Sequence, residues 1–402
     1  MVITSEGIYQ PLLNPDKCTH CKKCISSCPG HRVDFKKLNC DIFDTEPRNR
    51  RIGNLIECYV GHSTNEDIRF NSSSGGIATR LLLFAIENDI IDGALVTRMK
   101  KDNPTEPETY IARNKDEIIA ASKSKYCPVA ANAALRQILD EEGRFAVVGL
   151  PCHIHGVRKA ENESRILAKR IVLHIGLLCS HMTSFAGVEF LLRKLRIDPG
   201  DIARIDYRGQ GWPGSMVIQE KDGRVVTLPL FGSWKAYWPI FSSFFFTPMR
   251  CTMCPDQAAE LADISLGDAW LPEFKNEKRG ESIIAARTKK GLDILTLANT
   301  AGYISLRKVP AQKLEQSQMV NLIFKKKDLP SRLLLLGLYG KQTPRFNLPQ
   351  ARALRLSSLL RSAFMFCNIR VSASGALRPI LRGIPFPLFR GYYGIYKYLS
   401  RL

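Results

Sequence analysis

The sequence has no acidic residue after Asp328 and no apolar run as long as the roughly eighteen residues of a membrane-spanning helix. Its N-terminus lacks a basic stretch followed by an apolar one, so we expect no signal peptide and a chain that stays in the cytosol. Hydrophobic residues make up 45% of the 402 residues. This composition excludes wholesale disorder and predicts a globular protein of two or three domains.

The formal net charge of +20 is spread unevenly. Residues 329–402 contain twelve Lys or Arg and no acid, which gives this tail +12 and leaves +8 for residues 1–328. An anionic partner is therefore expected at the tail. Its Arg-rich, aromatic, amphipathic runs favour an anionic surface at the inner face of the membrane, or an acidic redox partner, over nucleic acid, and no nucleic acid is expected. The alternative is a basic face packed on the protein's own body.

Twelve cysteines in a cytosolic chain indicate metal ligation or catalysis, because that compartment keeps thiols reduced. Four of them, Cys18, Cys21, Cys24 and Cys28, form a CxxCxxCxxxCP motif. Two-residue spacers let thiolates surround one iron–sulfur cube, so the motif predicts a 4Fe-4S cluster. A zinc knuckle is the alternative, but zinc sites prefer two CxxC pairs separated by a longer run.

The fourth ligand of this cluster stays open. In ferredoxins with two clusters, the last cysteine of such a run ligates the other cluster, and this sequence holds no second copy of the motif. Cys28 either completes its own cluster or leaves that place to Cys58 or Cys40.

Helical and β-prone patterns alternate after the first cysteine motif, which predicts an α/β core with a mixed, partly parallel sheet. We expect a small ferredoxin-like cluster unit over residues 1–60, an α/β domain over 61–328 and a basic amphipathic tail over 329–402. The elements expected are helices over 77–89, 128–142 and 183–195, a helix from near His153, strands over 91–98, 144–150 and 170–179, and a hairpin turning at Asp222-Gly223.

A second group of cysteines is dispersed along the chain. Cys152 and Cys179 follow two predicted parallel strands, so both are expected at the sheet edge where open α/β sheets place ligands. Cys251 and Cys254 form a CxxC. By number, the four could complete a second four-thiolate site. A redox-active CxxC and a zinc site are the alternatives.

Two glycine-containing stretches invite comparison with phosphate-binding loops. Residues 209–214 match GxGxxG, but Pro213 lies inside the match and a strand pattern follows, so we reject a dinucleotide fingerprint. Residues 72–76 precede a predicted helix, where an ordinary N-cap is favoured over a phosphate site. Lys123, Lys125 and Tyr126 could face the same cleft.

Ordered blocks over residues 15–310 resemble the coenzyme F-420 hydrogenase/dehydrogenase β-subunit family. The sequence departs from that family's pattern at Cys127, Leu150 and His153, which puts the substrate in doubt. The matching blocks are 18–29, 72–82 (SSSGGIATRLL), 91–96, 122–128 (SKSKYCP), 147–160 (VVGLPCHIHGVRKA), 174–179, 207–214 and 251–270.

The resemblance implies an oxidoreductase in which a flavin, FAD, lies next to one or two 4Fe-4S clusters. The flavin would exchange hydride with a small organic substrate or the deazaflavin coenzyme, and single electrons with the clusters, with ferredoxin as another electron partner. An electron-transfer subunit without its own substrate site is the alternative, and a homo-oligomer stays open. Carried onto this sequence, the implied ligands of a cluster near the flavin are Cys152, Cys179, Cys251 and Cys254, and the implied flavin-pocket residues are Ser74, Gly75, Gly76, Lys125, Gly149 and Asp268.

Overall fold

An eight-stranded mixed sheet forms the centre of the molecule, as the computed structural model shows for the described residues 1–347 and 355–401. Its order is β14-β4-β13-β12-β8-β7-β5-β6. The neighbours β5, β7, β8 and β12 pair in parallel, and the remaining pairs are antiparallel, which confirms the predicted sheet type. The strands are β4 (Glu57–Ser63), β5 (Gly93–Met99), β6 (Pro107–Ala112), β7 (Phe145–Gly149), β8 (Ile171–Leu177), β12 (Ile264–Asp268), β13 (Ser282–Ala286) and β14 (Ile304–Val309).

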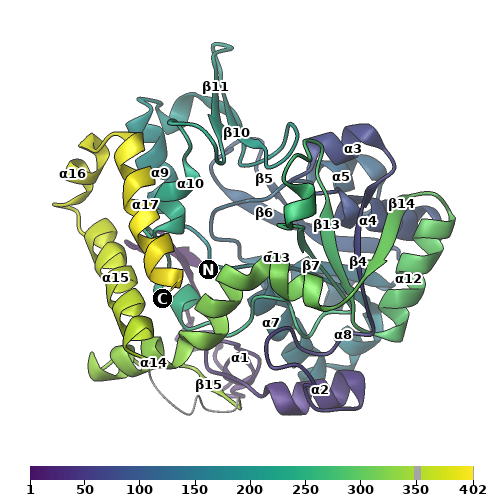
Figure 1. Cartoon of the computed structure of the whole chain (residues 1–402). Helices are drawn as coiled ribbons and strands as arrows, with labels where there is room; N and C mark the ends of the chain where they lie inside the picture. Colours follow the sequence, from purple (N-terminus) through teal and green to yellow (C-terminus); the bar gives the residue numbers. More distant parts are fainter. Residues whose placement is uncertain (348–354, 402) are drawn as a thin grey trace.

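Helices cover this sheet and shield its apolar strands from water (Figure 1). The predicted helix over 77–89 is α4, but the one over 128–142 begins late, as a three-ten turn at Ala131–Ala134, because no side chain caps its start. The helices around the sheet are α3 (Glu66–Asn71), α4 (Ile77–Glu87), α5 (Lys115–Ala120), α6 (Leu135–Asp140), α7 (Pro151–Glu163), α8 (Arg165–Arg170) and α12 (Lys289–Thr300).

A three-stranded antiparallel sheet lies beside the central one and packs its own aromatic cluster. It consists of β9 (Ile202–Asp206), β10 (Ser215–Glu220) and β11 (Val225–Pro229), and the predicted hairpin joins the last two. The neighbouring helices are α9 (Phe185–Lys194) and α10 (Trp238–Ser242). The GxGxxG match indeed leads into a strand, β10, and not into a helix.

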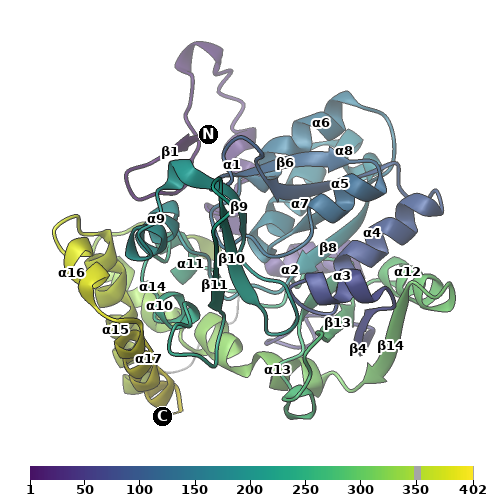
Figure 2. The same cartoon turned by 90° about the horizontal axis from the view of Figure 1, so that it is seen from above.

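The N-terminal segment contains little regular structure, and part of it projects from the body in Figure 2. Its elements are β1 (Val2–Ile3), β2 (Tyr9–Gln10), α1 (Lys23–Ser26), β3 (Arg32–Val33) and α2 (Phe35–Phe43). Strand β15 (Arg345–Phe346) pairs in parallel with β3. The domain boundary expected at residue 60 falls inside strand β4, and this strand belongs to the central sheet.

The tail forms helices that pack against the body. They are α14 (Leu329–Leu338), α15 (Leu356–Ala373), α16 (Arg378–Gly383) and α17 (Phe386–Arg401), preceded by α13 (Gln312–Leu322) and a π-helical turn at Ile323–Lys327. Phe366 and Tyr396 of the tail share an apolar cluster with Phe244 and Phe324. Residues 348–354 and 402 of the expected tail lie outside the described residues.

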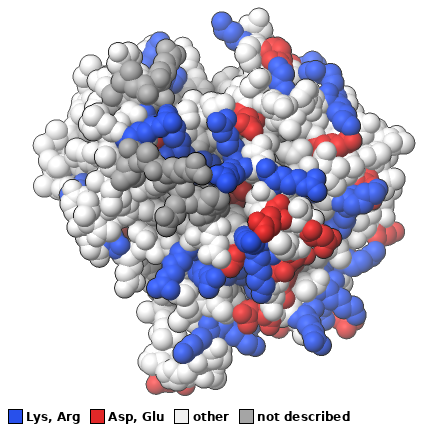
Figure 3. Space-filling view, turned by 60° about the horizontal axis from the view of Figure 1, so that its bottom comes forward, with Lys and Arg blue, Asp and Glu red and all other residues white. Residues whose placement is uncertain are grey.

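Not all of the tail's charge faces water. Arg361 is buried and forms a 2.7 Å ion pair with Asp328, the last acidic residue of the chain. On the face in Figure 3, Lys and Arg are interspersed with acidic side chains over much of the surface. Within the described part of the chain, no helix combines the length and apolarity needed to span a membrane.

Candidate functional site

The first cysteine group lies on an exposed loop around the short helix α1. The backbone N–H of Gly30 donates to the Cys28 sulfur at 3.2 Å, and a backbone N–H at Lys23 lowers the pKa of the Cys21 thiol. Backbone amides directed at sulfur stabilise thiolates, as an iron–sulfur loop requires.

Neither alternative fourth ligand has a comparable position. Cys58 is 2% exposed, lies on β4 inside an apolar cluster, and burial raises its pKa to about 11. Cys40 is exposed on α2. The structure therefore favours Cys28 as the fourth member of this group.

The second cysteine group assembles from three places in the chain. Cys152 lies in the first turn of α7 after β7, and Cys179 lies just past β8. Cys251 lies in α11 (Met249–Thr252), with Cys254 two residues past its end. As expected for parallel strands, β7 and β8 deliver their cysteines to one edge of the sheet.

These four thiols influence one another electrostatically. Burial raises the pKa of Cys152 to about 12, and Cys254 and Cys251 raise it further as neighbouring negative charges. Burial and the same neighbours raise the pKa of Cys179 as well. Among the described residues, no three His, Cys, Asp or Glu side chains converge tightly enough to hold a single ion. The mutual influence of the thiols shows that the four lie near one another.

Cations surround the second group, and the sequence did not reveal two of them. Burial lowers the pKa of Lys325, but negative charge on Cys254, Cys179 and Cys251 outweighs this effect and raises it overall. Arg332 donates from Nε to the Thr252 carbonyl at 2.6 Å, between the two cysteines of the CxxC. Lys325 lies just before the tail and Arg332 lies in its first helix, both far along the chain from any cysteine motif, so no local pattern could have pointed to them.

Arg250 joins the two cysteine groups. Its guanidinium donates to the carbonyl oxygens of Pro29 at 2.6 Å and Gly30 at 3.1 Å. Lys159 of α7 adds a hydrogen bond to the Cys28 carbonyl at 2.8 Å. The first group is therefore docked against the two elements, α7 and α11, that carry Cys152 and Cys251 of the second group.

A buried histidine–carboxylate pair fixes the CxxC loop to α7. His155 is 2% exposed, and its Nε2 lies 2.8 Å from Oδ2 of Asp256, two residues after Cys254. Burial alone would raise the pKa of Asp256, but the hydrogen bond and charge of His155 hold it below its usual range. The same carboxylate accepts the backbone N–H groups of Ala258 and Glu260, which sets the shape of the loop.

A cavity of about 910 Å³ lies beside the second cysteine group and includes Cys179 in its wall. This volume is of the size that cofactor and ligand sites usually have. Five of the six residues predicted for a flavin pocket line it: Ser74, Gly76, Lys125, Gly149 and Asp268.

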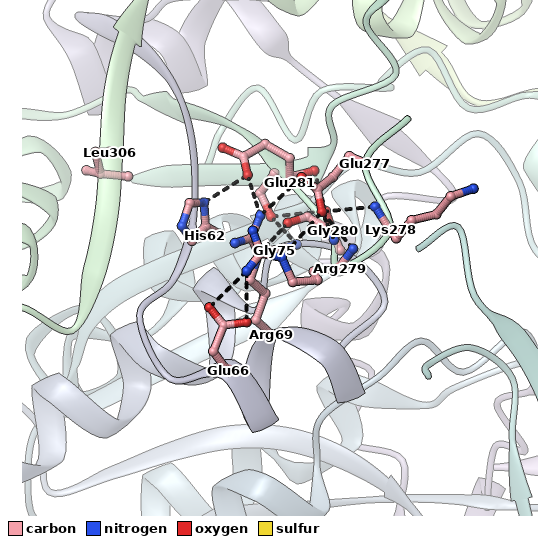
Figure 4. Close-up of polar contacts among 12 residues, drawn as sticks. His62, Glu66, Arg69, Gly75, Glu277, Lys278, Arg279, Gly280, Glu281 and Leu306 are labelled. Atoms are coloured by element: carbon pink, nitrogen blue, oxygen red, sulfur yellow. Dashed lines mark hydrogen bonds and ion pairs between the residues drawn. The ribbon is translucent and has the colours of Figure 1, made fainter. Parts of the chain in front are cut away.

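The sixth, Gly75, is not in the wall but directly behind it. A Cβ there would lie 2.6 Å from the Gly61 carbonyl, so only glycine fits between β4 and β13. Its N–H donates to Ser282 Oγ at 2.9 Å. Figure 4 shows the polar network beside it, in which Arg69 donates to the Gly280 carbonyl and pairs with Glu281, and His62 contacts the same carboxylate.

The start of α4 faces the cavity without a side-chain cap. The favoured N-cap prediction is wrong, because the capping position is Gly76, with φ 78°, and Ser72 turns back to the Ile68 carbonyl. Ser74 Oγ donates to the Glu281 carbonyl at 2.9 Å. Uncapped amides at the start of this helix are a favourable place for an anionic group such as a phosphate.

A buried ion pair forms another part of the wall. Both oxygens of Asp268 accept from the Arg208 guanidinium, at 2.8 and 3.0 Å, and Trp212 Nε1 donates to it at 2.7 Å. Burial would lower the pKa of Arg208, but Asp268 outweighs burial and raises it. Both oxygens of the carboxylate are thus hydrogen-bonded, and these bonds hold this part of the cavity wall in place. Arg208 was missed, although it lies in the block 207–214 that contains the GxGxxG match.

Lys125 and His153 line the cavity but direct their polar atoms into the protein. Lys125 Nζ donates to the carbonyls of Ala121, Ser122 and Lys123, and burial lowers its pKa to about 7. His153 Nδ1 accepts from the Leu150 N–H at 3.3 Å, and burial lowers the pKa of His153 to about 4. The imidazole is therefore neutral at pH 7 and holds the turn before Cys152 in place.

Comparison with known proteins agrees with this architecture. Family profiles described as coenzyme F420 hydrogenase/dehydrogenase, beta subunit, match residues 58–136 (N-term) and 142–312 (C terminus). The coenzyme F420 hydrogenase subunit beta of Methanothermobacter thermautotrophicus is 28% identical over 300 residues, which cover 70% of this chain and 99% of that protein. The coenzyme F420-dependent sulfite reductase of Methanocaldococcus jannaschii is 28% identical over 61% of this chain and 37% of its own length.

One solved structure shows the same fold. A chain of the F420-reducing [NiFe] hydrogenase complex from Methanosarcina barkeri superposes with a TM-score of 0.58 at 22% identity, over 74% of this chain and 98% of that one. The profile matches place the chain in a family of oxidoreductases. The chain belongs to the coenzyme F420 hydrogenase/dehydrogenase beta-subunit family, which confirms the resemblance seen in the sequence.

Proposed function

We propose that this protein is an iron–sulfur flavoenzyme that moves electrons between 4Fe-4S clusters and FAD, and that the flavin exchanges hydride with an organic substrate or the deazaflavin coenzyme. The observation that carries the proposal is that Cys179 is part of two features at once. It belongs to the four-cysteine group, and it lines the cavity that holds the flavin-pocket residues. A cluster bound there would lie beside a cofactor in the cavity.

The donor set suits the clusters. All four members of each cysteine group are thiols, and sulfur-only sites select iron–sulfur clusters or zinc. The cationic side chains of Lys325 and Arg250 would offset the negative charge that four thiolates bring into a buried site. The uncapped start of α4 suits the phosphates of a dinucleotide cofactor.

The flavin would supply the conversion between two-electron and one-electron steps, and the chain's residues would hold and isolate it. The Arg208–Asp268 pair fixes one wall, and the Ser74 hydroxyl fixes another by donating to the Glu281 carbonyl just before β13. The docking of Pro29 and Gly30 on Arg250 keeps the first cysteine group near the second, so that electrons have a short path inward.

Partner proteins and the coenzyme belong to this proposal. The relatives are named as coenzyme F420 hydrogenase subunits and an F420-dependent sulfite reductase, and the solved relative is part of a hydrogenase complex. These names favour coenzyme F420 and further redox subunits as partners, with ferredoxin as another electron partner. They also keep the alternative of a subunit that only relays electrons to its partner enzyme.

The test is anaerobic turnover by the isolated holoprotein. We expect reduced F420, or reduced ferredoxin, to bleach the flavin absorbance and to be consumed catalytically when an artificial acceptor is present. Bleaching without multiple turnovers would support the relay subunit. A chain that carries iron but neither binds nor reduces a flavin, with cofactor loss during purification excluded, would contradict the proposal.

The tail's expected contact with an anionic membrane surface also stays a proposal. Leu356 and Leu360 of α15 and Leu388 and Ile395 of α17 are exposed beside the tail's basic residues. Exposed aliphatic side chains combined with positive charge are typical of surfaces that bind the lipid interface.

A further inference from the structure

Helix α17 forms a wall of the cavity. Its residues Arg390, Tyr393, Tyr396 and Lys397 line the space that also contains Cys179 and the flavin-pocket residues. Positions 390, 393 and 397 recur at helical spacing, so they share one face of α17. The family profiles end at residue 312, and one relative is covered over 99% of its length by only 70% of this chain. The wall thus lies beyond the residues that the family profiles match.

Aromatic rings connect this wall to the cysteine-bearing loop. His181, two residues after Cys179, packs on Phe244 with a centroid distance of 4.7 Å. Phe244 in turn contacts Tyr396 at 5.2 Å and Phe324 at 5.0 Å. Flat, polarisable surfaces of this kind accommodate planar ring systems.

The polar atoms of this part of the cavity favour a negative ligand. Arg390 and Lys397 are exposed and have no ion pair with any described residue, and the chain has no acid after Asp328 to neutralise them. Lys397 lies 4.9 Å from the Tyr393 ring centroid, which places a cation beside an aromatic surface.

We propose that α17 builds the substrate-selecting end of the cavity, where Tyr393 and Tyr396 contact a planar redox-active ring system and Arg390 and Lys397 bind a phosphate, carboxylate or sulfonate attached to it. This inference rests on the proposed function, since it assigns the substrate class of the same cavity. The four residues that this inference assigns to the ligand all lie after residue 328, whereas the cysteines and flavin-pocket residues that support the proposed function lie before it.

Equilibrium dialysis of the oxidised holoprotein against two matched probes tests it. The probes are anthraquinone-2-sulfonate and its neutral analogue 2-(hydroxymethyl)anthraquinone. We expect the sulfonate to bind about tenfold more tightly than the neutral probe, and R390Q/K397Q to remove that preference without changing the affinity for the neutral probe. Tyr393→Leu should weaken both probes equally, because it removes a ring surface and no charge.

The control variant K341Q/R370Q removes two tail charges outside the cavity wall and should keep the wild-type preference. Equal binding of both probes by the wild type, or equal loss of preference in the control variant, would overturn the inference. Flavin content is measured in every sample. A chain without flavin contradicts the proposed function whatever the probes do, whereas a flavin-loaded chain without charge preference contradicts only this inference.

Discussion

Arg250 donates a 2.6 Å hydrogen bond to the Pro29 carbonyl and so ties the residue before Cys251 to the residue after Cys28. A second bond, to the Gly30 carbonyl at 3.1 Å, makes the link bidentate. Charge-assisted hydrogen bonds of this kind contribute roughly 1.5–3 kcal/mol each. The spacing between the two cysteine groups therefore depends strongly on this side chain, with Lys159 as a second link.

We expect Arg250→Ala to release the N-terminal loop from the body. The rate of limited proteolysis within residues 1–50 should rise at least about tenfold, since the local opening free energy falls by more than about 1.4 kcal/mol. Lys22→Ala, in the same loop but without a contact to α7 or α11, is the matched control. Unchanged cleavage of Arg250→Ala would show that the link does not hold the loop.

Cys28→Ser should lose the iron of the first cluster, whereas Cys58→Ser should keep it. The reason is that Cys28 lies in the exposed loop with its three partners, and Cys58 lies in the core strand β4. Iron analysis and EPR of the reduced proteins measure the effect, with Cys40→Ser as control. Loss of iron in Cys58→Ser together with full iron in Cys28→Ser would reverse the assignment.

Asp268→Asn should destabilise the fold and weaken flavin retention together. The change leaves the buried Arg208 guanidinium without its countercharge, which costs about 3–5 kcal/mol. Urea unfolding and the flavin dissociation constant give the two values. Glu141→Gln, which breaks the exposed pair with Arg113, should cost less than about 1 kcal/mol. Equal effects of the two substitutions would mean that the Arg208–Asp268 pair is not a structural wall.

The buried carboxyl of Glu260 is expected to make the free energy of unfolding depend on pH. Burial raises its pKa to about 7, although Lys326 partly offsets the shift. The folded state therefore holds this proton more tightly than the unfolded state, and the carboxyl's contribution to stability falls as pH rises from about 4.5 to 7. Glu260→Gln should gain stability over the wild type across that range, by about 1–3 kcal/mol, and lose the advantage below it.

The matched control for this prediction is Glu163→Gln, an exposed carboxyl on the surface of α7. Because this side chain is exposed, its replacement should change the unfolding free energy by no more than about 0.5 kcal/mol. A constant difference between Glu260→Gln and the wild type from pH 4.5 to 7.5 would show that Glu260 titrates normally.

The tail should bring the protein to anionic vesicles. We expect co-sedimentation with phosphatidylserine-containing vesicles that weakens with salt, because the contact combines charge with exposed aliphatic side chains. Leu388→Ser/Ile395→Ser should reduce binding, while Leu338→Ser, on another exposed helix of the tail, should matter less. Equal binding to neutral vesicles would contradict an electrostatic contribution.

The fold could be predicted from the sequence because its signals are local, and the same holds for the grouping of the first four cysteines. Buried strands such as Phe145–Gly149 are continuous apolar runs, and the CxxCxxCxxxCP motif is a spacing within one loop. The family resemblance supplied the pocket residues that no spacing would show.

Contacts between distant segments were beyond sequence reasoning. Lys325 and Arg332 reach the second cysteine group only because the chain turns back at α13 and α14. Arg361 lies in an amphipathic run, yet it is buried by its pair with Asp328, and the apolar faces of α15 and α17 serve packing on the body. An amphipathic pattern does not tell which surface its apolar face will meet.

The most direct test of the central claim is the iron, sulfide and flavin content of anaerobically purified protein, compared with Cys152→Ser and Cys251→Ser. Two clusters and a flavin predict about eight irons and one flavin per wild-type chain, and about four irons in either variant. Wild-type protein with about four irons, unchanged in both variants, would contradict a cluster at the second cysteine group. Zinc in place of iron there would contradict it equally.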